Sequence, residues 1–111
     1  MKTLYNPWDI VLCPMKFSDW VGWKFRPVVI LAEDRWDFLV CAISKQLHQG
    51  WQFDLLINSD NENNLRSEKS VIRIFKITTI TPELIHKKRW KLSKNDWIHL
   101  KDNMQQFVNS R

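Results

Sequence analysis

Short apolar runs separated by polar turns occupy most of residues 9–77, and this pattern restricts the chain to a β-rich fold. The clearest runs are residues 27–32 and 38–43, where β-branched and other apolar residues follow one another without a polar break. A fully apolar run of this length indicates a strand that is buried on both faces. Residues 33–35 are polar and supply the turn between them. The two runs therefore predict a pair of central strands.

Three further segments read as strands with less regular patterns. Residues 9–14 form a short apolar run that Pro14 either ends or places at a sheet edge. Residues 51–57 alternate imperfectly and predict a half-buried strand, which the polar loop 58–64 follows. Residues 70–77 predict a strand that places two sets of side chains on opposite faces. One set is Val71, Arg73, Phe75 and Ile77, and the other is Ile72, Ile74 and Lys76.

Arg73 interrupts an otherwise apolar strand. Either its side chain reaches solvent at a mouth of the sheet, or it is held in a polar site.

Helix signals are confined to the C-terminal third. Thr81 followed by Pro82 is typical of the start of a short helix. Ser93 with Asp96 three residues later resembles a capping box and predicts a second helix of about 16 residues. Its apolar stripe comprises Trp97, Leu100, Met104, Phe107 and Val108. Short strands followed by a terminal helix predict a mainly β fold in one domain spanning residues 1–111, a small antiparallel barrel closed by that helix.

The chain is basic, and its surplus charge is concentrated near the C-terminus. The 111 residues carry 17 Lys and Arg against 12 Asp and Glu, a formal net charge of +5. Residues 86–111 hold seven of the cations and two of the anions, so the whole surplus lies there. One interpretation is a solvated helix face with a basic end, and the other is a surface that binds an acidic partner or RNA.

Several functional classes lack support in the sequence. Cys13 and Cys41 lie in apolar runs and are expected to be buried free thiols, although a disulfide between neighbouring strands remains an alternative. The three His residues have no second ligand at metal spacing, so no metal or other cofactor is expected. Neither a glycine-rich phosphate loop nor a nucleophile elbow is present. No run is long enough to span a membrane, and we expect a cytoplasmic protein.

What remains is a set of cations and hydroxyls at strand ends. Arg26 precedes the run 27–32, Ser44 follows the run 38–43, and Arg73 lies within the run 70–77. RNA cleavage without a metal requires little more, because the attacking group is the 2′-hydroxyl of the substrate itself. The protein must accept a proton, stabilise the charged phosphate and protonate the leaving oxygen. An arginine guanidinium suits the second task.

Several segments resemble the PemK/MazF family of toxins from type II toxin–antitoxin systems. The resemblance rests on D-I-V-L at residues 9–12, G-W-K-F-R-P-V-V-I-L at 22–31 and C-A-I-S-K-Q at 41–46. It continues through L-R-S-E-K-S-V-I-R at residues 65–73 and L-S-K-N-D at 92–96. The pairing of R-P with I-S-x-Q at this separation is more specific than either half alone.

The resemblance implies an SH3-like barrel with a C-terminal helix, assembled as a homodimer. It also implies a metal-independent endoribonuclease that cuts single-stranded RNA, leaves a 2′,3′-cyclic phosphate and is neutralised by an acidic antitoxin. Arg26 would be the catalytic arginine, Ser44 would bind or polarise the phosphate, and Arg73 would match a second basic residue. Candidate RNA-binding residues around them are Lys24, Lys45, Gln46, Trp20 and Trp23.

The sequence departs from the family pattern at two informative positions. Trp8 stands where the family has Gly before the first-strand Asp, and Phe75 stands where some members have an acidic residue. A mechanism that uses that carboxylate cannot operate here. Alternative functions are a toxin of the same fold that binds nucleic acid without cutting it or targets gyrase, and an RNA-processing factor with no antitoxin.

Overall fold

The apolar runs of the first half form neighbouring antiparallel strands in the computed structural model, which describes residues 5–15, 23–44, 52–58 and 69–110. These strands are β1 (Asp9–Met15), β2 (Lys24–Glu33) and β3 (Phe38–Ser44). Each pairs with the next in the chain. The two central apolar runs therefore lie side by side, as the sequence predicts.

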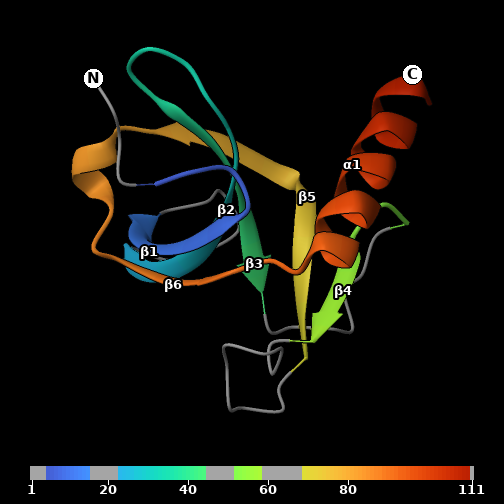
Figure 1. Ribbon diagram of the computed structural model, residues 1–111, viewed down its shortest axis with the longest axis horizontal. Helices are drawn as coiled ribbons and strands as arrows, with labels where there is room; N and C mark the ends of the chain where they lie inside the picture. Colours follow the sequence, from blue (N-terminus) through green and yellow to red (C-terminus); the bar gives the residue numbers. More distant parts are fainter. Residues whose placement is uncertain (1–4, 16–22, 45–51, 59–68, 111) are drawn as a thin grey trace.

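The next two strands extend the sheet on the β3 side. Strand β4 (Leu55–Asn58) is shorter than predicted, because residues 52–53 form a turn. Strand β5 (Lys69–Ile80) runs beyond the predicted segment and lies between β3 and β4. The six strands take the order β4-β5-β3-β2-β1-β6, and all the pairings are antiparallel. The sheet curls into a half-barrel with β4 and β6 at its two edges (Figure 1).

Strand β6 (Lys87–Lys91) was not expected from the sequence. Its residues are four cations and one Trp, a composition without strand alternation. It forms because it pairs with β1, with a bulge between the pairs Ile10–Trp90 and Val11–Lys88. The interpretation of this basic segment as part of a helix face is therefore wrong for residues 87–91.

A buried carboxylate stabilises the junction between β1 and β6. Asp9 is fully buried, and its Oδ2 accepts a hydrogen bond of 2.9 Å from the backbone N–H of Asn6. Its Oδ1 lies 3.4 Å from Nζ of Lys88 and 3.8 Å from Nζ of Lys91. Two of the surplus cations of the C-terminal region therefore compensate an internal charge.

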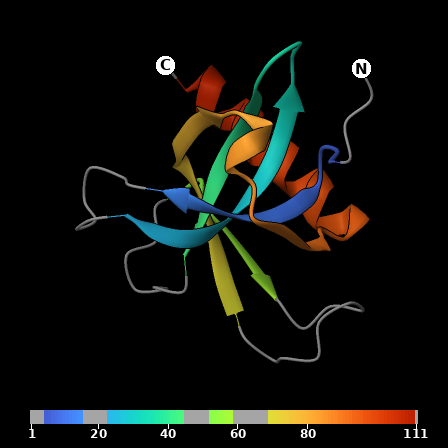
Figure 2. The ribbon, with the colours of Figure 1, turned by 90° about the vertical axis from the view of Figure 1, so that its left-hand side faces the viewer.

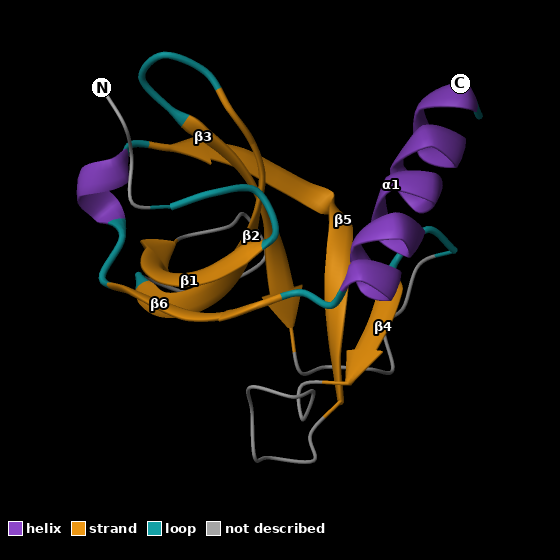
Figure 3. Cartoon of the chain, in the orientation of Figure 1, coloured by secondary structure: helices purple, strands orange, loops and turns teal. Residues whose placement is uncertain are grey.

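Among the described residues, a 3-10 helix and an α-helix complete the fold, and Figure 3 shows their places beside the strands. The short 3-10 helix η1 (Pro82–Leu84) begins after Thr81, whose side chain makes no capping hydrogen bond. Helix α1 (Lys94–Asn109) begins after Ser93, whose Oγ accepts a hydrogen bond of 3.1 Å from the backbone N–H of Asp96. The predicted N-cap and the predicted length of α1 are both confirmed.

The two faces of the sheet form two separate hydrophobic cores, because side chains alternate along each strand. The core beneath α1 contains Ile10, Val29, Cys41, Ile72 and Leu100 among others, with Trp97, Met104 and Phe107 packed against it. Val108 is exposed, so the predicted apolar stripe is wrong at this residue. The core inside the curl contains Val11, Cys13, Val28, Val40 and Ile80 among others.

Figure 2 places α1 behind the sheet and the β1–β2 pair in front of it. Helix α1 therefore covers one face and leaves the inner curve on the other side. Within the described part of the chain, no helix is long and apolar enough to cross a membrane.

Candidate active site

The two residues that the sequence singles out first lie near the ends of neighbouring strands. Arg26 lies near the start of β2, and Ser44 is the last residue of β3. The two strands pair with Val28 opposite Ala42. Continuing this antiparallel register by two residues brings Arg26 level with Ser44. Both are half-buried, and the Nε atom of Arg26 is buried.

Arg73 joins them from the next strand of the sheet. It pairs with Ala42, while Ser44 pairs with Val71. Residues paired across two strands point to the same face, and so do residues two apart along one strand. Arg26, Ser44 and Arg73 therefore belong to one face on three adjacent strands, the face that α1 does not cover.

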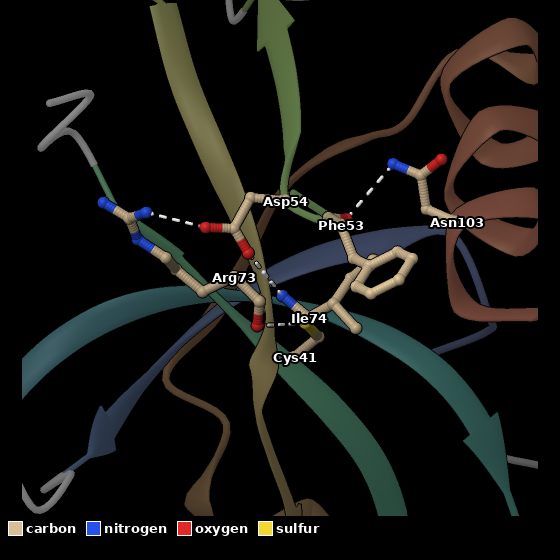
Figure 4. A network of polar contacts seen from close by, with 6 residues as sticks. All are labelled: Cys41, Phe53, Asp54, Arg73, Ile74 and Asn103. Atoms are coloured by element: carbon tan, nitrogen blue, oxygen red, sulfur yellow. Dashed lines mark hydrogen bonds and ion pairs between the residues drawn. The ribbon is translucent and has the colours of Figure 1, made fainter. Parts of the chain in front are cut away.

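An ion pair holds Arg73 in place. Its Nη1 donates to Oδ2 of Asp54 at 2.8 Å, and the side chains of Arg73 and Asp54 are only 11% and 5% exposed. The other carboxylate oxygen accepts a bond of 3.3 Å from the backbone N–H of Ile74 (Figure 4). Of the two alternatives for Arg73, the structure has the polar site. A charge this buried requires such a partner.

The turn that carries Asp54 is attached to α1. Nδ2 of Asn103 in α1 donates to the carbonyl oxygen of Phe53 at 3.1 Å. The buried Phe53 ring lies 5.7 Å from the ring of Phe107, measured between centroids. Sequence analysis missed Asp54. The available signal was a lone carboxylate in one apolar run and a lone cation, Arg73, in another.

An irregularity in β5 sets the direction of Arg73. Cys41 pairs with Ile77 while the next residue of β3, Ala42, pairs with Arg73, so residues 74–76 have no counterparts on β3. Sγ of Cys41 donates to the carbonyl oxygen of Arg73 at 2.8 Å and fixes the backbone there. The predicted alternation of side chains along this strand fails here. Phe75, which the sequence predicts to share a face with Arg73, is 68% exposed.

The predicted RNA-binding residues are only partly within the described ranges. Trp23 is 70% exposed, and the neighbouring Lys24 is exposed and pairs with Met15 of β1. Both lie within three residues of Arg26 in the sequence. The remaining three candidates, Trp20, Lys45 and Gln46, lie outside the residues that the structure describes.

The cysteines are buried and unbridged, as expected. Burial raises the pKa of Cys13 to about 11. Burial and the nearby charge of Asp54 raise the pKa of Cys41 further. Both thiols therefore stay protonated near neutral pH. In the described ranges, no three His, Cys, Asp or Glu side chains are grouped so that they could hold a metal ion.

The match to a protein family covers nearly the whole chain. Residues 6–108 match the model of the PemK-like, MazF-like toxins of type II toxin–antitoxin systems. The chain belongs to this family. The resemblance inferred from the five sequence segments is thereby confirmed.

Solved structures of MazF-like toxins share the fold. The chain is similar to the Mycobacterium tuberculosis toxin MazF-mt6, with a TM-score of 0.72, 17% sequence identity, and coverage of 91% of this chain and 96% of that one. A MazE–MazF structure from Deinococcus radiodurans gives a TM-score of 0.72 at 9% identity, with 96% and 98% covered. A mycobacterial endoribonuclease in complex with its cognate antitoxin gives 0.70 at 6% identity, with 95% of each chain covered. No curated protein matches the sequence.

The departures from the MazF-like pattern at Trp8 and Phe75 lie where the backbone is irregular. Trp8, at the family's Gly position, has φ 82°, in the left-handed region that favours Gly. Phe75 lies in the irregular segment of β5, and the carboxylate beside Arg73 comes instead from Asp54. The carboxylate that contacts Arg73 therefore comes from a residue 19 positions earlier in the chain.

Proposed function

We propose that this MazF-like toxin is an endoribonuclease that cleaves single-stranded RNA without a metal ion. The observation that carries the proposal is the placement of Arg26, Ser44 and Arg73 on one face of three adjacent strands. Family membership supports the same reaction, since two of the similar solved structures are described as endoribonucleases.

The proposed reaction is a transesterification followed by release. The 2′-oxygen of the substrate attacks the adjacent phosphorus and loses its proton, while the bond from phosphorus to the 5′-oxygen breaks and that oxygen gains a proton. The products are a 2′,3′-cyclic phosphate and a 5′-hydroxyl. Charge accumulates on the phosphate oxygens in the transition state, so fixed cations at that position accelerate the step.

The three side chains divide the tasks of this scheme among them. The guanidinium of Arg26 binds the reacting phosphate and takes part in proton transfer, as the family resemblance implies. The hydroxyl of Ser44, level with Arg26 in the strand register, donates a hydrogen bond to a phosphate oxygen. Arg73 presents a second guanidinium from the neighbouring strand, in an ion pair with Asp54.

The nucleotides on either side of the cleaved bond are assigned to residues around Arg26, Ser44 and Arg73. Lys24, Lys45 and Gln46 contact phosphates and bases, and Trp20 and Trp23 stack on unpaired bases. An aromatic ring as exposed as that of Trp23 suits stacking, which contributes about 1–3 kcal/mol per base.

Two protein partners complete the proposal. A cognate antitoxin with an acidic segment covers the RNA site, as complexes with antitoxins among the similar structures support. A second copy of the chain forms a homodimer. The proposed location is the cytoplasm.

The decisive experiment compares wild type with Arg26→Ala on a long single-stranded RNA in the presence of EDTA. Wild type should cut the RNA, and the variant should be slower by at least about 100-fold, the typical cost of removing one transition-state donor. Ser44→Ala should lose about 10- to 100-fold, because a hydrogen bond to a charged group is removed. RNA with a 2′-deoxy residue at the cleaved position should resist wild type.

Equal cutting by wild type and Arg26→Ala would refute the assigned mechanism. Expression in cells separates the alternatives: loss of bulk mRNA supports the nuclease, and DNA damage with intact RNA supports a gyrase-targeting toxin. If a neighbouring gene encodes an acidic protein that suppresses the toxicity, the antitoxin is supported. If no such gene is present, an RNA-processing factor is supported.

A further inference from the structure

We infer that Asp54 is a positioning residue that fixes the guanidinium of Arg73 toward the RNA phosphate, and that α1 maintains it there through Asn103. The inference rests on the proposed function and concerns the same face of the sheet. It assigns a role to a carboxylate that the family pattern near position 75 does not predict.

The geometry at Asp54 restrains both ends of the contact. One carboxylate oxygen accepts from Nη1 of Arg73 at 2.8 Å, and the other accepts from the backbone N–H of Ile74 at 3.3 Å. The carboxylate is thus bound both to the Arg73 side chain and to the backbone immediately after it (Figure 4). A long side chain held in this way loses most of its rotamer freedom before a substrate arrives.

A guanidinium has five N–H donors in a rigid fork, more than one carboxylate oxygen can accept. A pre-oriented cation stabilises a developing phosphate charge without reorganising during the reaction.

The sign of the charge argues against a purely electrostatic role. A carboxylate beside a phosphate-binding site repels RNA, so a site selected for binding alone gains by losing it. Asp54 is nevertheless buried in contact with Arg73. Its contribution to the reaction is therefore to orient the guanidinium through a charge-assisted hydrogen bond.

Helix α1 determines where Asp54 lies. The bond of 3.1 Å from Asn103 to the carbonyl oxygen of Phe53 fixes the residue next to Asp54, and the Phe53–Phe107 contact fixes the same turn from its apolar side. Strand β3 fixes the opposite side, because Sγ of Cys41 donates to the carbonyl oxygen of Arg73. Helix α1, on one face of the sheet, thus helps to fix the orientation of Arg73 on the other face.

The test combines kinetics with the NMR signals of the Arg73 side chain in the full chain. Asp54→Asn keeps the shape and removes the charge, and Asp102→Asn, on an exposed site of α1, is the matched control. For Asp54→Asn we expect kcat to fall about 10- to 100-fold, with KM changed less than about threefold. The Arg73 guanidinium signals should be distinct in wild type and averaged in this variant. Asp102→Asn should match wild type in both measurements.

A double-mutant cycle separates this effect from a loss of stability. If Asp54 acts through Arg73, adding Asp54→Asn to Arg73→Ala should cause no further loss of kcat. Asn103→Ala should shift kcat and the Arg73 signals in the same direction by a smaller amount, with the sheet intact by circular dichroism. Full kcat in Asp54→Asn, or losses that add in the double variant, would overturn the inference.

The NMR measurement keeps the two proposals distinguishable. Wild type that leaves RNA intact contradicts the nuclease, whereas the Arg73 signals still report whether Asp54 fixes the guanidinium. Sharp, distinct Arg73 signals in Asp54→Asn would contradict the positioning role even in an active nuclease.

Discussion

Trp8 shows how one residue can carry two opposing contributions to stability. Its φ of 82° disfavours any residue with a side chain, at a cost of roughly 1–2 kcal/mol. The strained backbone is bonded on both sides, from its N–H to the Ile30 carbonyl and from the Leu92 N–H to its own carbonyl, each at 3.0 Å. The indole lies 5.4 Å from the ring of Trp97, between centroids, and 5.7 Å from Nζ of Lys91. Packing against the start of α1 offsets the strain.

Two substitutions at this position separate these contributions. Trp8→Ala removes the packing and keeps the strain, and it should lower the free energy of unfolding by about 3 kcal/mol. Trp8→Gly removes both and should be more stable than Trp8→Ala by about 1 kcal/mol. Urea denaturation measures the difference, and equal stability of the two variants would show that the backbone is not strained.

Cys13 makes stability depend on pH in the alkaline range. Its pKa rises from 9.0 in the unfolded chain to about 11 in the folded protein, since burial disfavours the thiolate. The unfolded state therefore loses its proton first as pH rises, and stability contributed by Cys13 is lost between about pH 9 and 11. Cys13→Ala should show a flatter decline of unfolding free energy over that window in urea titrations. Parallel curves for the two proteins would contradict the raised pKa.

Among the elements of this chain, local sequence signals predict the bounds of a helix better than those of a strand. Ser93 defines the start of α1, because its Oγ accepts a hydrogen bond from the backbone N–H of Asp96, which has no partner within the helix. Strand β6 has no comparable local signal, because its charged residues acquire strand geometry only through pairing with β1. The same dependence explains why β4 starts later than its apolar run: the preceding turn is held from α1 by Asn103.

The capping bond gives a prediction for α1. Ser93→Ala should lower the free energy of unfolding by about 1 kcal/mol, while Ser93→Asp should preserve it, because Asp also accepts from the N–H of Asp96 and favours the positive end of the helix. Thermal unfolding followed by circular dichroism distinguishes them. A Ser93→Ala protein as stable as wild type would mean that the cap contributes nothing.

For the whole molecule, the sheet edge at β4 is the surface that we expect to take part in assembly. Leu56 on this edge strand is exposed, and so are Ile98 and Val108 on α1, which contacts β4. An exposed apolar strand edge favours association with another chain. We expect the proposed homodimer to bury this surface.

Light scattering tests this assembly. The wild-type mass should be twice the 13.4 kDa of one chain, and Leu56→Asp should shift it toward one chain without unfolding. Trp36→Asp is the matched control, because Trp36 is also exposed but lies in the β2–β3 turn. A wild-type monomer at high concentration, or equal effects of both substitutions, would contradict an interface at β4.

The sequence by itself determined the central strands, the cap and length of α1, the buried thiols and the family, because each depends on neighbours along the chain or on spaced motifs. Only the tertiary structure decided the rest. It made Lys87–Lys91 an edge strand, exposed Phe75, and joined Asp54 to Arg73 across 19 positions. These outcomes depend on strand order and on a local break in register, which side-chain periodicity does not encode.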